Sequence, residues 1–94
     1  MFVRVVRFAD VSAERMQALL DRIEAAGGPP PGVSSTGLKV MFDEQQGTAV
    51  VLQEFATAED MAEAAKVFSA MDTAETPGTR VSVDATELKA DLRP

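Results

Sequence analysis

The 94-residue chain contains no His, Cys, Trp, Tyr or Asn. The absence of His and Cys excludes Ser-His-Asp and Cys-His catalysis, disulfides, and zinc sites built on nitrogen or sulfur ligands. With Tyr also absent, the usual protein ligands of haem are missing. We therefore expect neither a metal ion nor a cofactor, and chemistry is left to Asp, Glu, Lys, Arg, Ser, Thr, Gln and Met.

Positive charge is scarce as well. Nine Lys and Arg residues stand against fifteen Asp and Glu residues, which gives a net charge of −6. Such a charge repels phosphate backbones and anionic membranes, so we expect no nucleic-acid partner and no membrane partner. Arg4 and Arg7 interrupt the segment in which a signal peptide would need an unbroken apolar stretch, and zero cysteine agrees with a reducing compartment. We expect a cytoplasmic location.

The residues that are present have the composition of a globular protein with one core, 46% hydrophobic and 26% charged. We expect a single domain over residues 1–88 and a polar tail over residues 89–94. Alternating and helically spaced apolar residues predict strands at 2–8, 38–43, 48–55 and 81–86 and helices at 13–26 and 58–71. A loop is predicted over residues 72–79.

Two stretches of the sequence repeat each other. Phe8-Ala9 followed by Ser12-Ala13-Glu14-Arg15-Met16 matches Phe55-Ala56 followed by Thr57-Ala58-Glu59-Asp60-Met61. In each stretch a hydroxyl side chain stands between a strand and a helix, where an N-cap belongs. Two such halves in the order βαββαβ form the split βαβ arrangement. We therefore predict an α+β, ferredoxin-like fold with a four-stranded antiparallel sheet.

The alternation within the strands predicts a sheet with two different faces. Aligning the repeat sets the first and third strands side by side and parallel, with Arg7 beside Glu54. A two-residue turn at Gln46-Gly47 sets Lys39 opposite Glu54. The face that should take the helices carries Phe2, Arg4, Val6, Phe8, Leu38, Val40, Phe42, Val51, Gln53 and Phe55. The other face carries Val3, Val5, Arg7, Lys39, Met41, Asp43, Val50, Leu52 and Glu54.

The second face combines an apolar patch with charged side chains. Soluble monomers rarely expose such a patch, and the chain has no element left to cover it, so we expect a homodimer packed sheet against sheet. Arg7, Lys39 and Glu54 on this face form either an acid–base cluster or a cross-strand salt-bridge network. The network is the simpler interpretation, and Asp84 joins it if its side of the last strand faces the same way.

A chain of this length with the order βαββαβ and a two-sided sheet resembles the dimeric α/β-barrel superfamily, which includes the antibiotic-biosynthesis-monooxygenase-like proteins. The resemblance covers residues 1–88 and implies two sheets that close a homodimeric barrel, with a monooxygenase-like activity. Members that oxidise polyaromatic substrates without a cofactor, or degrade haem, use Trp, Tyr, Asn or His side chains. This sequence contains none of them.

Arg4 and Gln53 are the two polar residues on the face that should take the helices. One hypothesis is a ligand pocket between sheet and helices, lined by Arg4, Phe42, Gln53, Phe55 and Phe68. In it, Arg4 meets an anionic or carbonyl group of a flat apolar molecule. In the alternative, Arg4 reaches water and Gln53 bonds to backbone.

The second predicted helix is rich in small residues, namely Ala62, Ala64 and Ala65. The pocket hypothesis therefore places a gap beneath residues 58–71, facing Phe42 and Phe55. The opposing expectation is that this helix sits closer to the sheet and closes the gap, because protein interiors pack densely.

The leading functional hypothesis is a small-molecule-binding protein, or a cofactor-independent enzyme, that acts on a hydrophobic metabolite. No catalytic residue can be assigned. The alternative is a non-catalytic dimer that serves as a regulatory or accessory module. A ferredoxin-like RNA-binding module is a third possibility, which the acidic charge and the absence of Tyr and Trp for base stacking disfavour.

Overall fold

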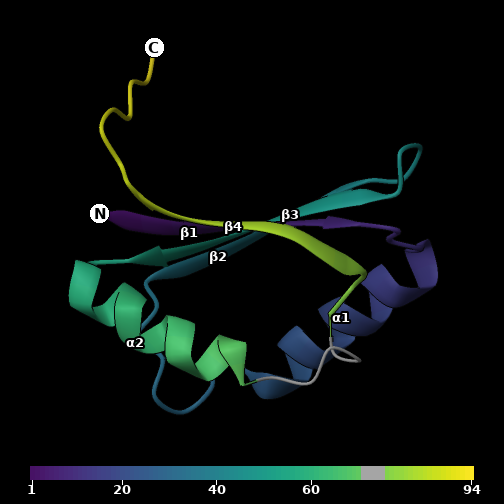
Figure 1. Cartoon of the computed structure of the whole chain (residues 1–94), viewed down its shortest axis with the longest axis horizontal. Coiled ribbons are helices and arrows are strands. Elements are labelled where there is room, and N and C mark those ends of the chain that lie inside the picture. Colours follow the sequence, from purple (N-terminus) through teal and green to yellow (C-terminus); the bar gives the residue numbers. More distant parts are fainter. Residues whose placement is uncertain (71–75) are drawn as a thin grey trace.

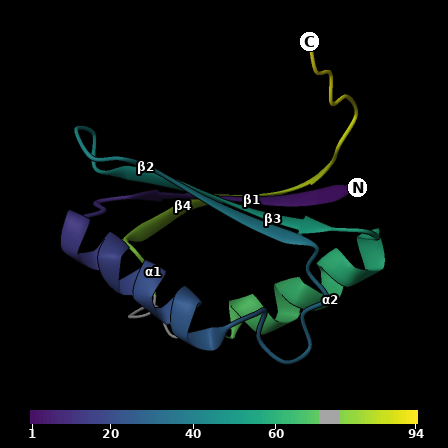
Figure 2. The same ribbon diagram turned by 180° about the vertical axis from the view of Figure 1, so that it is seen from behind.

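The computed structural model describes residues 1–70 and 76–94, which form one sheet and two helices. The elements follow one another as β1 (Phe2–Ala9), α1 (Ala13–Ala26), β2 (Gly37–Asp43), β3 (Thr48–Phe55), α2 (Ala58–Ser69) and β4 (Thr79–Glu87). The strand order is β2-β3-β1-β4, and every neighbouring pair is antiparallel. Both helices lie on one side of the sheet (Figures 1 and 2). The predicted α+β, ferredoxin-like fold is confirmed.

The helix boundaries follow from their caps. The Ser12 hydroxyl accepts a hydrogen bond from the Arg15 amide at 3.1 Å, and the Thr57 hydroxyl accepts one from the Asp60 amide at 3.1 Å. Gly27 ends α1 at φ 67°, a left-handed conformation that favours glycine. The bounds of α1 are those predicted, whereas α2 ends at Ser69. The predicted end of the second helix at Met71, and residues 72–75 of the predicted loop after it, lie outside the described residues.

The parallel alignment of the first and third strands is wrong. β1 and β3 are antiparallel, with Phe2 opposite Phe55 and Phe8 opposite Ala49. The strand order reads the same when the two halves of the chain exchange places and the sheet is read from its other edge. The repeat is therefore related by a two-fold rotation, which reverses strand direction, and not by a shift along the chain. The predicted faces survive because even-numbered residues of β1 still lie beside odd-numbered residues of β3, as in the predicted alignment.

The hairpin between β2 and β3 is also displaced from its predicted register, by two residues. Lys39 lies opposite Leu52 instead of Glu54, because the turn has four residues, 44–47, instead of two. The Asp43 carboxylate closes this turn by accepting from the Gln46 backbone amide at 3.1 Å. Gly47 adopts φ 67° and donates its amide to the Asp43 carbonyl at 2.9 Å. A displacement of two residues leaves every side chain on its predicted face.

The hydrophobic core consists of two separate clusters. The first joins β1, β3 and the start of α1 and contains Val6, Phe8, Val11, Met16, Ala49 and Val51. The second contains Val33, Phe55 and Ala64. Phe55 and Ala64 have no exposed surface at all, so α2 contacts the sheet closely at this point. Ala64 thus allows α2 to approach the sheet closely, as expected if protein interiors pack densely.

Gly78, immediately before β4, lies close to the end of β1, and this contact can be tested. A Cβ atom at Gly78 would collide with the Ala9 carbonyl oxygen and lie 2.8 Å from the Val11 Cγ2. Gly78→Ala should therefore lower the free energy of unfolding by about 1–3 kcal/mol, the usual cost of overpacking. Urea denaturation measures it. Gly28→Ala is the matched control, since a Cβ there meets nothing within 4 Å. Equal midpoints for the two variants would contradict the close approach of β4 to the end of β1.

Candidate ligand-binding site

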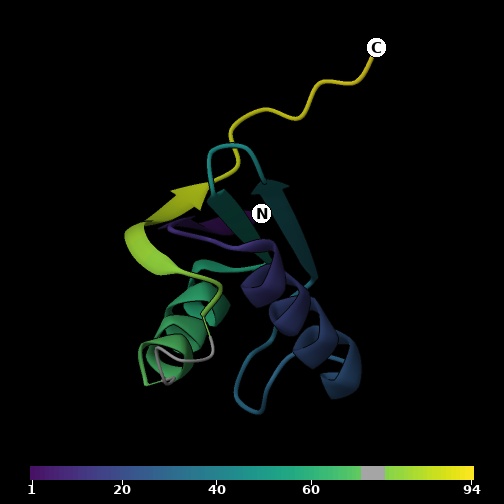
Figure 3. The same ribbon diagram turned by 90° about the vertical axis from the view of Figure 1, so that its right-hand side faces the viewer.

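A cleft of about 1240 Å³ lies between the helix-facing side of the sheet and α1. Its floor is the centre of the sheet, with Val6 and Phe8 from β1 and Val51 and Phe55 from β3. The α1 wall consists of Arg15, Leu19, Arg22, Ile23 and Ala26. Segments from residues 28–38 and 76–80 line the rest. Figure 3 shows α1 and α2 beside each other beneath the sheet. This volume exceeds that of ordinary ligand pockets, about 300–1,000 Å³.

The cleft lies only in part where the sequence places it. Only Phe68 and Ser69 of α2 line it, while Ala64 is packed against the sheet. The gap predicted beneath residues 58–71 is therefore present at Phe68 and Ser69 but not beneath Ala64, and the cleft extends along α1. The side chains of α1 are larger, yet only Met16 among them is buried. Met16 near the start of α1 holds that helix on the first cluster, while the α1 wall borders the open cleft.

Four of the five predicted ligand residues line this cleft: Arg4, Gln53, Phe55 and Phe68. Phe42 does not, because it packs against the first core cluster near the hairpin. Sequence reasoning missed the α1 wall and Arg80. Arg80 lies opposite Phe8, where a bulge in the β1–β4 pairing leaves Val81 without a partner. Simple alternation from Val83 would put Val81 at this position, so the sequence carries no local signal for the change.

Arg4 and Gln53 lie directly opposite each other in the β1–β3 ladder. Arg4 is only 6% exposed, and its Nη1 donates a 2.8 Å hydrogen bond to the Gln53 Oε1. The Arg4 guanidinium carbon lies 5.1 Å from the centroid of the Phe68 ring, a cation–π distance. The Nε of Arg4 is buried and has no hydrogen-bond partner. The alternative in which Arg4 reaches water and Gln53 bonds to backbone is therefore not what the structure shows.

The surroundings of Arg4 destabilise its positive charge. Burial lowers the pKa of Arg4 below its ordinary value, and the positive charge of Arg80 lowers this pKa further. Because Arg4 is protonated in both folded and unfolded chains at neutral pH, a lowered folded-state pKa means a cost to stability across the physiological range. Gln53 is neutral and offsets only part of this cost. An anion at Arg4 would offset more.

The opposite face of the sheet is uncovered by any described element (Figure 1). Val3, Val5, Val50 and Leu52 are half-buried by their neighbours, and Met41 is 47% exposed. We call these five residues the open-face patch.

The charged residues of the open face form two ion pairs. Lys39 pairs with Glu54 diagonally across the hairpin, and Arg7 pairs with Asp84 at 3.3 Å. The predicted proximity of Arg7 to Glu54 is wrong, since antiparallel pairing sets Val50 opposite Arg7. Asp84 does face the same way as Arg7. The three residues predicted as one cluster therefore lie in two separate ion pairs.

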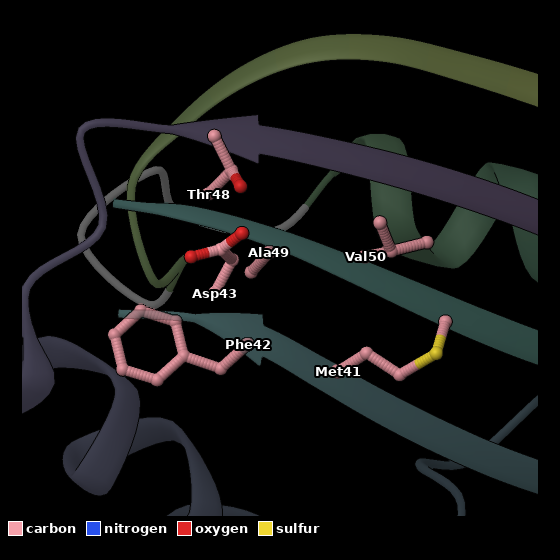
Figure 4. A pocket seen from close by; sticks show the side chains of 6 residues that line it. All are labelled: Met41, Phe42, Asp43, Thr48, Ala49 and Val50. Carbon is pink, nitrogen blue, oxygen red and sulfur yellow. The ribbon is translucent and has the colours of Figure 1, made fainter. Parts of the chain in front are cut away.

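A second, much smaller pocket of about 200 Å³ lies at the hairpin end of β2 and β3. Figure 4 shows its lining, with Met41 and Phe42 from β2 and Ala49 and Val50 from β3. Its volume falls below the usual lower limit for ligand pockets, about 300 Å³. The cleft is the better candidate site.

The described residues add two further findings. No group of three or more His, Cys, Asp or Glu side chains within residues 1–70 and 76–94 is arranged to hold a metal ion. None of the described helices is long and apolar enough to cross a membrane.

No protein-family model matches this chain, and no curated protein or solved structure matches it. Fold and site together define the class: a ferredoxin-like α+β domain with a largely apolar cleft between its sheet and its helices, and a buried arginine in the lining of that cleft.

The Arg4–Gln53 pair generates a stability prediction. Gln53→Leu removes the acceptor of the Arg4 Nη1 and should lower the free energy of unfolding by about 1–3 kcal/mol, the cost of a buried unpaired donor. Adding Arg4→Met should restore stability to the wild-type level or above it, because an apolar pair of similar volume replaces a buried polar pair. Urea denaturation of the three proteins measures both effects. A double variant less stable than Gln53→Leu would show that the pair is kept for stability.

Proposed function

We propose that this protein binds a small, largely apolar molecule in the cleft, with a polar end of the ligand at Arg4 and Gln53. The single observation that carries the proposal is the buried Arg4 in the lining of an apolar cleft, with an Nε that nothing in the described chain satisfies. Buried polar groups are normally paired, and an unpaired one at a cavity is a site for a ligand. A cytoplasmic metabolite is the kind of ligand we expect.

Binding is favoured over catalysis by the side chains of the cleft. Ser35, Thr36 and Ser69 supply hydroxyl groups. Among the described lining residues there is no carboxylate, Lys or His to act as a general base beside them. A monooxygenase-like activity would need the ligand itself to supply the reactive group. The resemblance to the antibiotic-biosynthesis-monooxygenase-like proteins therefore supports the fold and a dimer more than a reaction.

Calorimetry with a flat apolar molecule tests the proposal. We expect 2-naphthoate, 2-naphthamide or both to bind, and Leu38→Trp to weaken the binding at least about fivefold, because Leu38 lines the cleft and is 44% exposed. Leu20→Trp is the matched control: Leu20 is 40% exposed and stands on α1 outside the cleft lining. Binding of neither probe would overturn the proposal and leave the non-catalytic regulatory or accessory module as the better account.

We further propose that the protein is a homodimer, packed through the open-face patch. The support is an apolar sheet face that no described element covers, flanked by the Lys39–Glu54 and Arg7–Asp84 pairs. Such a patch is typical of an interface. Packing the sheets of two copies of the chain against each other would remove the patch from water.

Light scattering after size exclusion should therefore report a mass of about twice 10.0 kDa. Leu52→Glu should yield a folded monomer, because the partner would have to bury an unpaired carboxylate against apolar side chains. Leu20→Glu on α1 is the control and should remain a dimer. A monomeric wild-type protein at micromolar concentration would contradict the dimer and leave the cleft proposal intact, because the cleft lies on the other face.

A further inference from the structure

Positive charge gathers at the cleft of an acidic protein. Four of the six arginines of the chain, Arg4, Arg15, Arg22 and Arg80, line the cleft. No Asp or Glu occurs among its described lining residues, although the chain has fifteen acidic residues against nine basic ones. A concave site lined by one sign of charge and by apolar walls concentrates its electric field. Over its described lining the cleft is thus locally positive, while the protein as a whole is negative.

The arginines are not equivalent. Arg15 is anchored, because its Nη2 donates a 2.8 Å hydrogen bond to the Thr76 carbonyl at the cleft rim. Arg80 is exposed, and its guanidinium makes no hydrogen bond or ion pair with any residue in the described ranges 1–70 and 76–94. The bulge beside Phe8 sets Arg80 on the cleft side of the sheet. Arg80 is free to meet a ligand.

Arg4 offers the second free donor. Gln53 accepts from Nη1 alone, and Nε remains buried without a partner. A guanidinium donates from a rigid planar fork that fits the two oxygens of a carboxylate. A neutral carbonyl oxygen would satisfy Nε but would leave two neighbouring positive charges uncompensated. A carboxylate satisfies the donor and compensates the charge.

We infer that the ligand of the cleft is a carboxylic acid, with an apolar body along α1 and its carboxylate held by Arg4 and reached by Arg80. The inference rests on the proposed function and decides between the anionic and the carbonyl end that the sequence leaves open. It also assigns Arg80 as a binding residue. Charge-assisted hydrogen bonds are about twice as strong as neutral ones, so the acid should bind more tightly than its neutral isostere.

Calorimetry with 2-naphthoate and 2-naphthamide at neutral pH tests the inference, since the two probes have nearly the same shape and differ in charge. We expect the acid to bind at least about tenfold more tightly than the amide. Arg80→Gln should reduce the affinity for 2-naphthoate about three- to tenfold and leave that for 2-naphthamide unchanged. Arg80 is exposed, so this variant should fold.

Arg7→Gln is the matched control. It removes the same charge from β1, but Arg7 lies on the open face, so neither affinity should change. An amide that binds as tightly as the acid, or an Arg80→Gln effect equal to that of Arg7→Gln, would overturn the inference and leave the proposed function standing. Binding of neither probe would overturn both.

Discussion

The Arg4–Gln53 pair divides the interior of this small domain in two. On β1 the residue lies between Phe2 and Val6, and on β3 its partner lies between Val51 and Phe55. Apolar side chains on either side of the pair collect into separate clusters, one with the start of α1 and one with α2. A continuous apolar stripe would allow both helices to settle on one core. The polar pair prevents this, and the cleft occupies the space between the two attachments.

The attachments differ because the side chains differ. Ala64 brings the α2 backbone close to Phe55, and both residues are completely buried. On α1, Met16 is buried in the first cluster, while Leu19 and Ile23 are half-buried at the cleft wall. Small residues permit close approach, and long residues keep a helix axis farther from the sheet. The width of the cleft along α1 follows from this contrast.

Much of this arrangement follows from local sequence patterns. Helix ends depend on single capping residues such as Ser12, Thr57 and Gly27, whose chemistry is read directly. The assignment of side chains to the two faces depends only on parity, so it tolerated errors in both strand direction and hairpin register. Predicting that Arg4 lies opposite Gln53 requires the relative direction of β1 and β3 as well. The predicted parallel alignment of these strands does not pair the two residues.

Other features depend on contacts that no local pattern encodes. The Asp43 carboxylate accepts hydrogen bonds from Gln46 and so favours a four-residue hairpin turn. The composition of the turn is equally compatible with the shorter turn that the sequence predicts. Arg80 reaches the cleft through a bulge, and alternation alone assigns it to the opposite face. The position of the cleft depends on how closely each helix approaches the sheet. That distance is a property of the packed tertiary structure.

Alternation along β1 joins the two surfaces on which function is proposed. Arg4, Val6 and Phe8 face the cleft, while Val3 and Val5 face the other way toward the open-face patch. Both surfaces carry a cost for the isolated chain: a buried cation without an anion on one side, and apolar area in water on the other. A domain of this size has little stability to spare. Any molecule that binds only the folded state adds to that stability in proportion to the logarithm of its concentration over its dissociation constant. Binding of the proposed partners would lift both costs, an acid in the cleft on one side and a second copy of the chain on the other. Because the two surfaces lie on opposite faces of β1, each can be occupied without covering the other.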